Sequence, residues 1–428
     1  MKIISPLHRR FRCGLMTVLL ALIAFPLGLR AETEVIGTYL TWSDDPTTTM
    51  TINWVNIYPH TPATVRYRVK GEGEWQTQSG SHHTLTPSVL QVRQVSLDGL
   101  QPDTAYEFVI GEDPTASGTS VEWFRTMPRE LERPVRFVTG GDMMHTREMV
   151  DVMNERAGIL DPDFALLGGD FAYADGLYGT RWIDWLESWT SKARGKGGRL
   201  IPMVLAIGNH EVRGHYNGNI PHDAPYFYGL FKLPDGRSFH AHDFGNYLSL
   251  IILDSGHTEK IVGPQSEWLA KAVAARDEQT FLFPIYHYPA YGTTKGPPGK
   301  LPSEAGQSIQ IQNAWIPCFE RHGVTAVFEN DHHTYKRTHR ILRNQRDDER
   351  GLLFLGDGAW GVHTRPVPAP GEVWYLAHAE ARRHLFHVTL RPDGSAQIDA
   401  IDARGEVFDQ VSLDRPRTAP VQDPAADL

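Results

Sequence analysis

The sequence of 428 residues is poor in cysteine, since it contains only Cys13 and Cys318. Cys13 lies in an N-terminal segment that we expect to be removed, so the remaining chain can form no intramolecular disulfide. The fold must then be stable without disulfides, even in an oxidising compartment. Cys318 falls within a helix predicted over residues 309–321, where we expect it to be a small core residue.

Long apolar runs are also missing beyond the N-terminus. The one such run, residues 13–29, follows four basic residues and is succeeded by a tolerable cleavage site at Ala31. This pattern predicts a signal peptide over residues 1–31 and a secreted or periplasmic protein. The alternative is a retained membrane anchor, which we disfavour because Pro26 and Arg30 end the run.

Basic residues are fewer than acidic residues. Residues 1–31 contain five of the 42 Lys and Arg residues and no acid, so the rest of the chain has 37 basic against 51 acidic residues, a net charge of −14. This balance argues against a nucleic-acid partner, which requires a basic face. With 41% hydrophobic and 10% aromatic residues, the chain can form the cores of two or three domains.

Residues 32–127 predict an all-β domain. Short stretches of alternating apolar and polar residues recur with turns between them, at 51–54, 64–68, 92–97, 106–110 and 121–125. The spacing Leu100-x-Pro102-x-Thr104-x-Tyr106 resembles the tyrosine corner of sandwich domains. The segment resembles a fibronectin type III module, and we expect it to be a structural appendage.

After a predicted linker, residues 128–134, the pattern changes to alternating strands and helices over residues 135–413. This alternation predicts an α/β layered domain. Apolar strands are expected at 135–139, 164–167, 202–207, 247–253, 280–286 and 324–328, a helix at 264–275, and further strands at 352–355, 385–390, 396–401 and 407–413. An aromatic stripe with helical spacing, Trp182, Trp185, Leu186 and Trp189, is expected to be core. The polar tail 414–428 is expected to be disordered.

Five of these strands end in residues that bind metals. They supply Asp142, then Asp170 and Tyr173, then Asn209 and His210, then His287, and last Asp331, His332 and His333. Taken alone, Gly169-Asp170 is just as compatible with an ordinary tight turn. Because metal-binding residues follow several buried strands in the same way, a ligand site at the sheet rim is favoured. The set suffices for two metal ions that share one carboxylate. Such a pair can deprotonate a water and stabilise an in-line displacement at phosphorus.

We call these five groups of residues, each at the end of a strand, the five stations. In this order they resemble the signature of purple acid phosphatases within the calcineurin-like metallophosphoesterases. The strong matches are Gly169-Asp170-Phe171-Ala172-Tyr173 and Gly208-Asn209-His210-Glu211, and Gly356-Asp357-Gly358 also fits. The resemblance implies a four-layer metallophosphoesterase β-sandwich flanked by helices, preceded by the fibronectin III-like domain. It covers nearly the whole chain after residue 31.

Residue by residue, the resemblance implies two metal sites bridged by Asp170: one formed by Asp142, Tyr173 and His333, the other by Asn209, His287 and Asp331. A tyrosine phenolate favours ferric iron, and the second ion would be zinc, manganese or ferrous iron. His210 would protonate the leaving oxygen or hold the phosphate.

The sequence departs from the signature in three places. Asp331 stands where a second-metal histidine is expected, and the alternative ligand there is His332. Met144 replaces a glycine, and we expect Met143 and Met144 to pack beneath the site. The loop 288–295 lacks the substrate-binding histidines of plant relatives, so Lys295 or Thr294 would contact phosphate or, as we prefer, be solvated. Of the other histidines, His257 is a candidate for the pocket or its surroundings, and His145 either enters the pocket or, as we prefer, lies at the surface before a helix.

These features predict a secreted or periplasmic phosphomonoesterase, resembling acid phosphatases, that uses a metal-bound hydroxide on a small phosphorylated substrate. Within enzymes, the alternative is a phosphodiesterase or pyrophosphatase on the same scaffold. A different class of protein, a non-catalytic phosphate- or polyanion-binding member, would follow if the altered fifth station had lost the second metal. We favour the enzyme, because Asp331 still offers a carboxylate.

Overall fold

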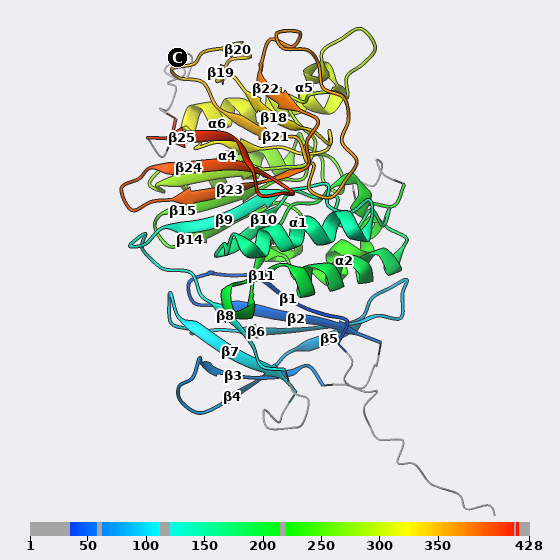
Figure 1. The fold of residues 1–428 in the computed structure, drawn as a ribbon, viewed down its shortest axis with the longest axis vertical. Coiled ribbons are helices and arrows are strands. Elements are labelled where there is room, and N and C mark those ends of the chain that lie inside the picture. The colour runs from blue at the N-terminus through cyan, green and yellow to red at the C-terminus, as the bar shows by residue number, and fades with distance from the viewer. Residues whose placement is uncertain (1–34, 58–61, 112–119, 215–219, 415–416, 419–428) are drawn as a thin grey trace, which may run out of the picture.

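The computed structural model describes residues 35–57, 62–111, 120–214, 220–414 and 417–418 (Figure 1). The predicted signal peptide, 1–31, and all but three residues of the predicted tail lie outside these ranges. Within them, no helix is both long and apolar enough to cross a membrane.

The N-terminal domain is built from strands alone. One layer is formed by β1 (Gly37–Thr41), β2 (Met50–Asn56), β6 (Gln91–Leu97) and β5 (Ser81–Thr84), and the other by β4 (Gln76–Ser79), β3 (Thr64–Val69), β7 (Ala105–Ile110) and β8 (Glu122–Arg125). Trp54, Val65 and Phe108 are fully buried between the layers. The Tyr106 hydroxyl accepts a hydrogen bond from the backbone N–H of Gln101 (2.9 Å), which confirms the predicted tyrosine corner.

Two large sheets form the second part of the molecule. The first continues from β1 into β13 (Met203–Leu205), β10 (Phe164–Leu167), β9 (Val135–Gly140), β23 (His384–Leu390), β24 (Ala396–Asp402) and β25 (Val407–Leu413). The second has the order β14 (His240–Phe244), β15 (Leu248–Ile252), β16 (Phe281–Ile285), β17 (Val327–Phe328), β21 (Phe354–Gly356), β18 (Tyr335–Thr338) and β22 (Leu376–Glu380). Two short ribbons pair β11 (Arg194–Gly195) with β12 (Arg199–Leu200), and β19 (Ile341–Leu342) with β20 (Gln345–Arg346).

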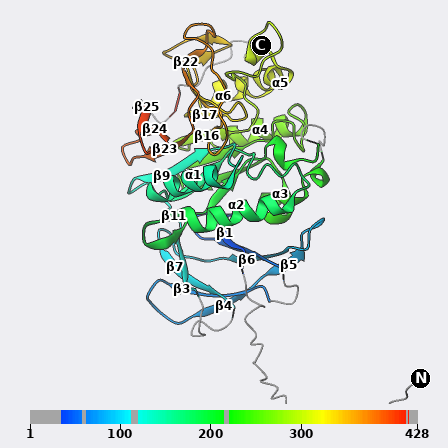
Figure 2. The ribbon, with the colours of Figure 1, turned by 45° about the vertical axis from the view of Figure 1, so that its right-hand side comes forward.

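Helices cover the outer faces of both sheets. The α-helices are α1 (Arg147–Ile159), α2 (Gly179–Lys192), α3 (Pro225–Leu230), α4 (Pro264–Ala274), α5 (Gly306–Ala314) and α6 (Ile316–His322), and the 3-10 turns are η1 (Lys196–Gly198), η2 (Asn209–Glu211), η3 (Pro221–Asp223), η4 (Pro234–Gly236) and η5 (Pro302–Glu304). α1 and α2 lie side by side against the first sheet, while α4 to α6 lie against the second (Figures 1 and 2). Phe137, Phe164 and Phe283 pack between the sheets. The result is the predicted four-layer arrangement of helix, sheet, sheet and helix.

The buried strands and the aromatic stripe follow the sequence pattern closely. β10 has the predicted bounds, and Trp182, Trp185 and Leu186 of α2 are fully buried. The single helix predicted over 309–321 is wrong, because the chain forms two helices that break at Trp315. Pro317 is the cause: it has no N–H to donate to the carbonyl four residues back. Cys318 is buried in α6, as expected.

The all-β domain is not an appendage. β1 pairs in parallel with β13 of the second part, so the two share one ten-stranded sheet. Trp42 packs edge-on against Phe244, with ring centroids 5.6 Å apart. In the connecting segment, Arg133 forms ion pairs with Asp103 (2.8 Å) and Asp163 (2.9 Å), one from each part. The boundaries at 127 and 135 stay predictions, but the core is continuous across them.

Candidate metal centre

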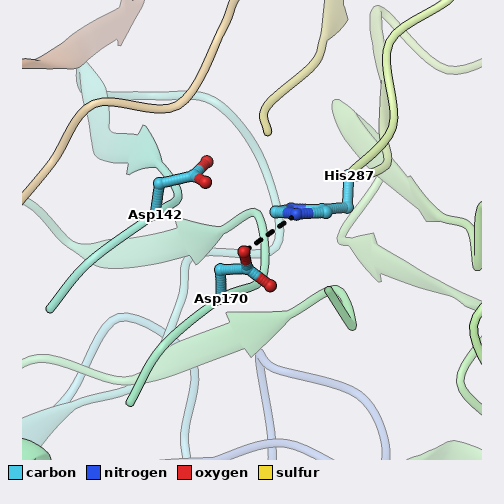
Figure 3. A group of neighbouring side chains, drawn as sticks. All are labelled: Asp142, Asp170 and His287. Atoms are coloured by element: carbon cyan, nitrogen blue, oxygen red, sulfur yellow. Dashed lines mark ion pairs between the residues drawn. The ribbon is translucent and has the colours of Figure 1, made fainter. Parts of the chain in front are cut away.

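The five stations meet because their strands run in parallel. β9, β10 and β13 are parallel neighbours in the first sheet, as are β16 and β17 in the second. Their carboxyl ends therefore open at one rim between the facing sheets. There Asp142, Asp170 and His287 point toward one another, each with a ligand atom within 4.8 Å of the others (Figure 3).

Asp142, Tyr173 and His333 form one group of potential ligands. The Tyr173 hydroxyl donates to Asp142 Oδ1 (3.1 Å) and lies 3.0 Å from His333 Nε2. His333 Nε2 is itself 3.0 Å from the same Asp142 oxygen. Burial and the carboxylate of Asp142 raise the pKa of the Tyr173 phenol well above its ordinary value, so a phenolate would form here only against a strong cation.

Asn209, His287 and Asp331 form a second group. His287 Nε2 lies 3.2 Å from Asn209 Oδ1 and 3.8 Å from Asp331 Oδ1, and its Nδ1 is held by the backbone carbonyl of Gly168 at 2.8 Å. Burial lowers the pKa of His287, but the surrounding carboxylates, chiefly that of Asp170, outweigh burial and raise it to about 10. The potential at this position is thus strongly negative.

Asp170 lies between the two groups, and the contacts of its two oxygens show whether a metal would fit there. Its Oδ1 accepts a hydrogen bond from the backbone N–H of His210 (2.8 Å). Its Oδ2 is buried without a hydrogen-bond donor and lies 3.3 Å from His287 Nε2. Leaving a buried carboxylate oxygen without a donor is costly, whereas a cation shared between the two groups would satisfy it. The oxygen and nitrogen donors present fit two metal ions.

The backbone is strained at five of these residues. Positive φ angles between 51° and 78° occur at Asp142, Asp170, Tyr173, Asp331 and His333. Side chains disfavour this left-handed region, and such strain persists where the surrounding structure enforces it, typically at functional sites. Gly358 provides room: a Cβ there would lie 1.7 Å from Asp142 Oδ2.

Glu211 holds the second and third stations together, a role that the sequence interpretation missed although the residue closes the matched motif. Its buried carboxylate accepts hydrogen bonds from the backbone N–H groups of Asp170 (2.7 Å), Phe171 (2.9 Å) and Gly208 (2.9 Å). These bonds fix the turn that carries Asp170 against η2, which carries Asn209 and His210.

At the fifth station, the hydrogen bonds of His332 favour Asp331 as the ligand. His332 Nδ1 accepts the backbone N–H groups of Thr293 (2.9 Å) and Thr294 (3.1 Å). Burial lowers the pKa of His332 well below its ordinary value, so the ring is neutral and its proton resides on Nε2. Neither nitrogen of His332 is then free to bind a metal.

Three neighbours of the site differ from expectation at least in part. His145 precedes the N-cap of α1 and is partly exposed, as expected, but it also faces the site, with its ring 4.8 Å from that of Tyr173 and 5.3 Å from that of His333. Lys295 is not simply solvated, because its ammonium contacts Asp331. Asp175, which no spacing rule marked, lies 2.6 Å from His210 Nδ1.

Two expectations about the surroundings agree with the structure. Met143 and Met144 are buried in the core beneath the first sheet's rim. His257 is buried beside the second group, with its ring 5.6 Å from that of His287 and its Nε2 3.0 Å from Ser255 Oγ.

Two protein families match consecutive parts of the chain. "Purple acid Phosphatase, N-terminal domain" matches residues 36–126, and "Calcineurin-like phosphoesterase" matches residues 141–335. Together these matches cover the strand-only domain and the candidate ligands at all five strand ends, from Asp142 to His333.

Curated relatives are distant. Purple acid phosphatase 13 of Arabidopsis thaliana is 25% identical over 66% of this chain and 57% of its own length. Purple acid phosphatase 15 of the same plant is 23% identical over 62% and 53%. The chain thus spans little more than half of these relatives. Tartrate-resistant acid phosphatase type 5 of Sus scrofa is 23% identical, over 71% of this chain and 92% of its own.

Solved structures share the fold. Purple acid phosphatase PPD1 from yellow lupin seeds superposes with a TM-score of 0.73 at 17% identity, covering 88% of this chain and 73% of its own. PhoD superposes with a TM-score of 0.64 at 12% identity, covering 88% and 91%. Both support the predicted α/β architecture with its N-terminal sandwich.

Proposed function

Because the chain matches the calcineurin-like phosphoesterases over residues 141–335 and the N-terminal domain of purple acid phosphatases over residues 36–126, we propose that it hydrolyses phosphomonoesters at a dinuclear metal centre. The observation that carries the proposal is the buried Oδ2 of Asp170, which has no hydrogen-bond donor and lies between two groups of ligand atoms. The segment 1–31, with its basic start and apolar run, supports a secreted or periplasmic location.

In this proposal each metal would have its own ligands, and the two would share Asp170. Asp142, Tyr173 and His333 would hold the first, and Asn209, His287 and Asp331 would hold the second. When bound, the pair supplies an acidified water and stabilises negative charge at phosphorus. Phenolate favours ferric iron at the first position, and a carboxylate in place of a histidine favours iron, manganese or magnesium at the second.

His210 is the proposed proton donor to the leaving oxygen. Its ring lies over that of Tyr173, with centroids 4.2 Å apart, and its Nε2 is 3.9 Å from Asp170 Oδ2. The opposite nitrogen, Nδ1, faces Asp175 at 2.6 Å. Asp175 therefore directs Nε2 toward the metal centre.

Replacing Asp175 with Asn is expected to lower kcat about tenfold to a hundredfold while leaving the metal content unchanged. An amide can still contact His210 Nδ1, but it lacks the negative charge of the carboxylate and holds the ring in its orientation less firmly. Steady-state kinetics, with metal analysis of the same samples, would check this. A loss of metal that parallels the loss of rate would contradict the positioning role.

The proposed function is tested by metal analysis and a visible spectrum. We expect two metals per chain, hydrolysis of p-nitrophenyl phosphate that a chelator abolishes, and a broad visible band from iron bound to a phenolate. Tyr173→Phe should remove the band, because it removes the phenol but keeps the ring. One metal or none after reconstitution, with no hydrolysis, would favour a non-catalytic phosphate-binding protein instead.

A further inference from the structure

Lys295 and the metal centre share one oxygen atom. Lys295 Nζ lies 2.5 Å from Asp331 Oδ1, and the same oxygen is 3.8 Å from His287 Nε2. The Asp331 side chain is 6% exposed and that of Lys295 is 39% exposed. One end of this ion pair is thus buried in the site, while the other remains accessible to a ligand.

The main chain beneath Lys295 is fixed by buried contacts. The N–H groups of Thr293 and Thr294 both point at His332 Nδ1, and the Thr293 hydroxyl donates to Asp357 Oδ2 (2.9 Å). His332 and Asp357 are both buried. Gly292 lets this turn approach, since a Cβ there would lie 2.1 Å from the His332 ring. The stem of Lys295 therefore starts from a defined point beside the centre.

We propose that the ammonium of Lys295 is a phosphate-binding group that leaves Asp331 when the second metal binds and then contacts a phosphoryl oxygen of the substrate. The inference rests on the proposed function. A metal ion and an ammonium on one carboxylate oxygen repel each other, so one displaces the other. A lysine is flexible enough to move by one side-chain length, and a phosphate dianion at the centre supplies the new partner.

Arg365 is another nearby cation, and its contacts differ. Arg365 Nη1 donates to the backbone carbonyl of Asp331 (3.3 Å), and its own N–H donates to the carbonyl of His333 (3.2 Å). These bonds tie Arg365 to the main chain of the fifth station. Lys295, in contrast, is held by the carboxylate that the second metal would claim, so it is released at the moment when substrate can bind.

The test is Lys295→Met, read out by two titrations that need no turnover. The second metal should bind at least several-fold more tightly, because the competing ammonium is gone. The affinity of the two-metal protein for inorganic phosphate should fall by at least about tenfold, because a charge-assisted contact is lost. Lys295→Arg should keep most of the phosphate affinity. Lys300→Met is the matched control: it lies on the same loop, its side chain is 60% exposed, and it should change neither affinity.

The expected gain in metal affinity and loss in phosphate affinity distinguish a phosphate-binding Lys295 from one that is structural or solvated. Equal losses of metal and phosphate affinity in Lys295→Met would mean that Lys295 only supports the loop, and unchanged affinities would mean that it is solvated; either result overturns the inference. A wild-type protein that binds two metals and phosphate but does not hydrolyse esters would overturn the proposed function, while the two titrations would still judge Lys295.

Discussion

Asp170→Asn is expected to lower phosphoester hydrolysis by more than about a hundredfold. Outer contacts of metal ligands are each worth roughly tenfold to a hundredfold, and Asp170 is the proposed bridge itself. The amide keeps an acceptor for the N–H of His210 but removes the negative charge that both metals would share. The protein should therefore retain at most one metal per chain. Kinetics and elemental analysis on the same preparation measure both quantities.

The same substitution should not unfold the protein. Asp170 Oδ2 has no hydrogen-bond donor within the ordinary limits, but His287 Nε2 lies 3.3 Å away, and although burial opposes this, the neighbouring histidines lower the pKa of Asp170. Asparagine removes the negative partner of His287, so the metal-free variant should stay folded but unfold at a lower temperature than the metal-free wild type. Added metal should stabilise the wild type more than the variant, because binding to the folded state alone raises stability.

Asp184→Asn is a suitable control, because Asp184 is an exposed carboxylate on α2, away from the strand ends. It carries the same chemical change and should alter neither metal content nor rate. If Asp170→Asn retained activity within tenfold of the wild type, the shared-carboxylate arrangement would be wrong, and a centre with independent metals would have to replace it.

Much of the centre was predictable because its residues follow buried strands directly. The four apolar residues of β10 end at Leu167, and only two glycines separate them from Asp170. Asp170 must therefore lie at the rim of the sheet. The contacts of Asp175 and Lys295 were not predictable, since they depend on where loops return. Lys295 is 36 residues from Asp331 in sequence, and only the turn anchored at His332 brings them together.

Two features of the strand pairing, the edge strand β5 and the contact between β1 and β13, could not be predicted from the sequence. All four residues of β5 are exposed, so no apolar alternation marks this strand. β1 is buried along its whole length, but its partner β13 lies in the second part of the chain, and a pairing across domains leaves no local signal. The break at Trp315 differs from these, because Pro317 is a local signal that ends a helix, although the pattern around Cys318 favours one continuous helix.

The second large effect is expected in stability, from Lys336→Met. Lys336 is fully buried, and its ammonium lies 2.5 Å from Glu329 Oε2, 2.8 Å from Asp357 Oδ1 and 2.7 Å from the carbonyl of Tyr291. Methionine fills similar space but leaves two buried carboxylates without their cation. Removing one partner of such a group costs roughly 3–5 kcal/mol of unfolding free energy. Urea denaturation at pH 7 measures it.

The consequence should reach the metal centre. Glu329 Oε1 accepts the Tyr286 hydroxyl (2.7 Å) and the backbone N–H of Ala290 (2.7 Å), on either side of His287. Asp357 Oδ2 holds Thr293, which begins the turn that carries Lys295. Lys336 therefore neutralises the two carboxylates that position the second ligand group. The variant should bind the second metal more weakly even where it remains folded.

The pH dependence identifies the cause. Burial raises the pKa of Asp357 to about 7 even though Lys336 opposes the rise, so losing the lysine raises this pKa further. A carboxyl whose pKa is higher in the folded state than in the unfolded state loses stability as pH rises through the folded value. The deficit of Lys336→Met should therefore be smaller at pH 5 than at pH 8. Adding Asp357→Asn should recover part of it at pH 8, whereas Lys271→Met, exposed on α4, should show no deficit at either pH. A deficit independent of pH would instead point to poor packing of the methionine.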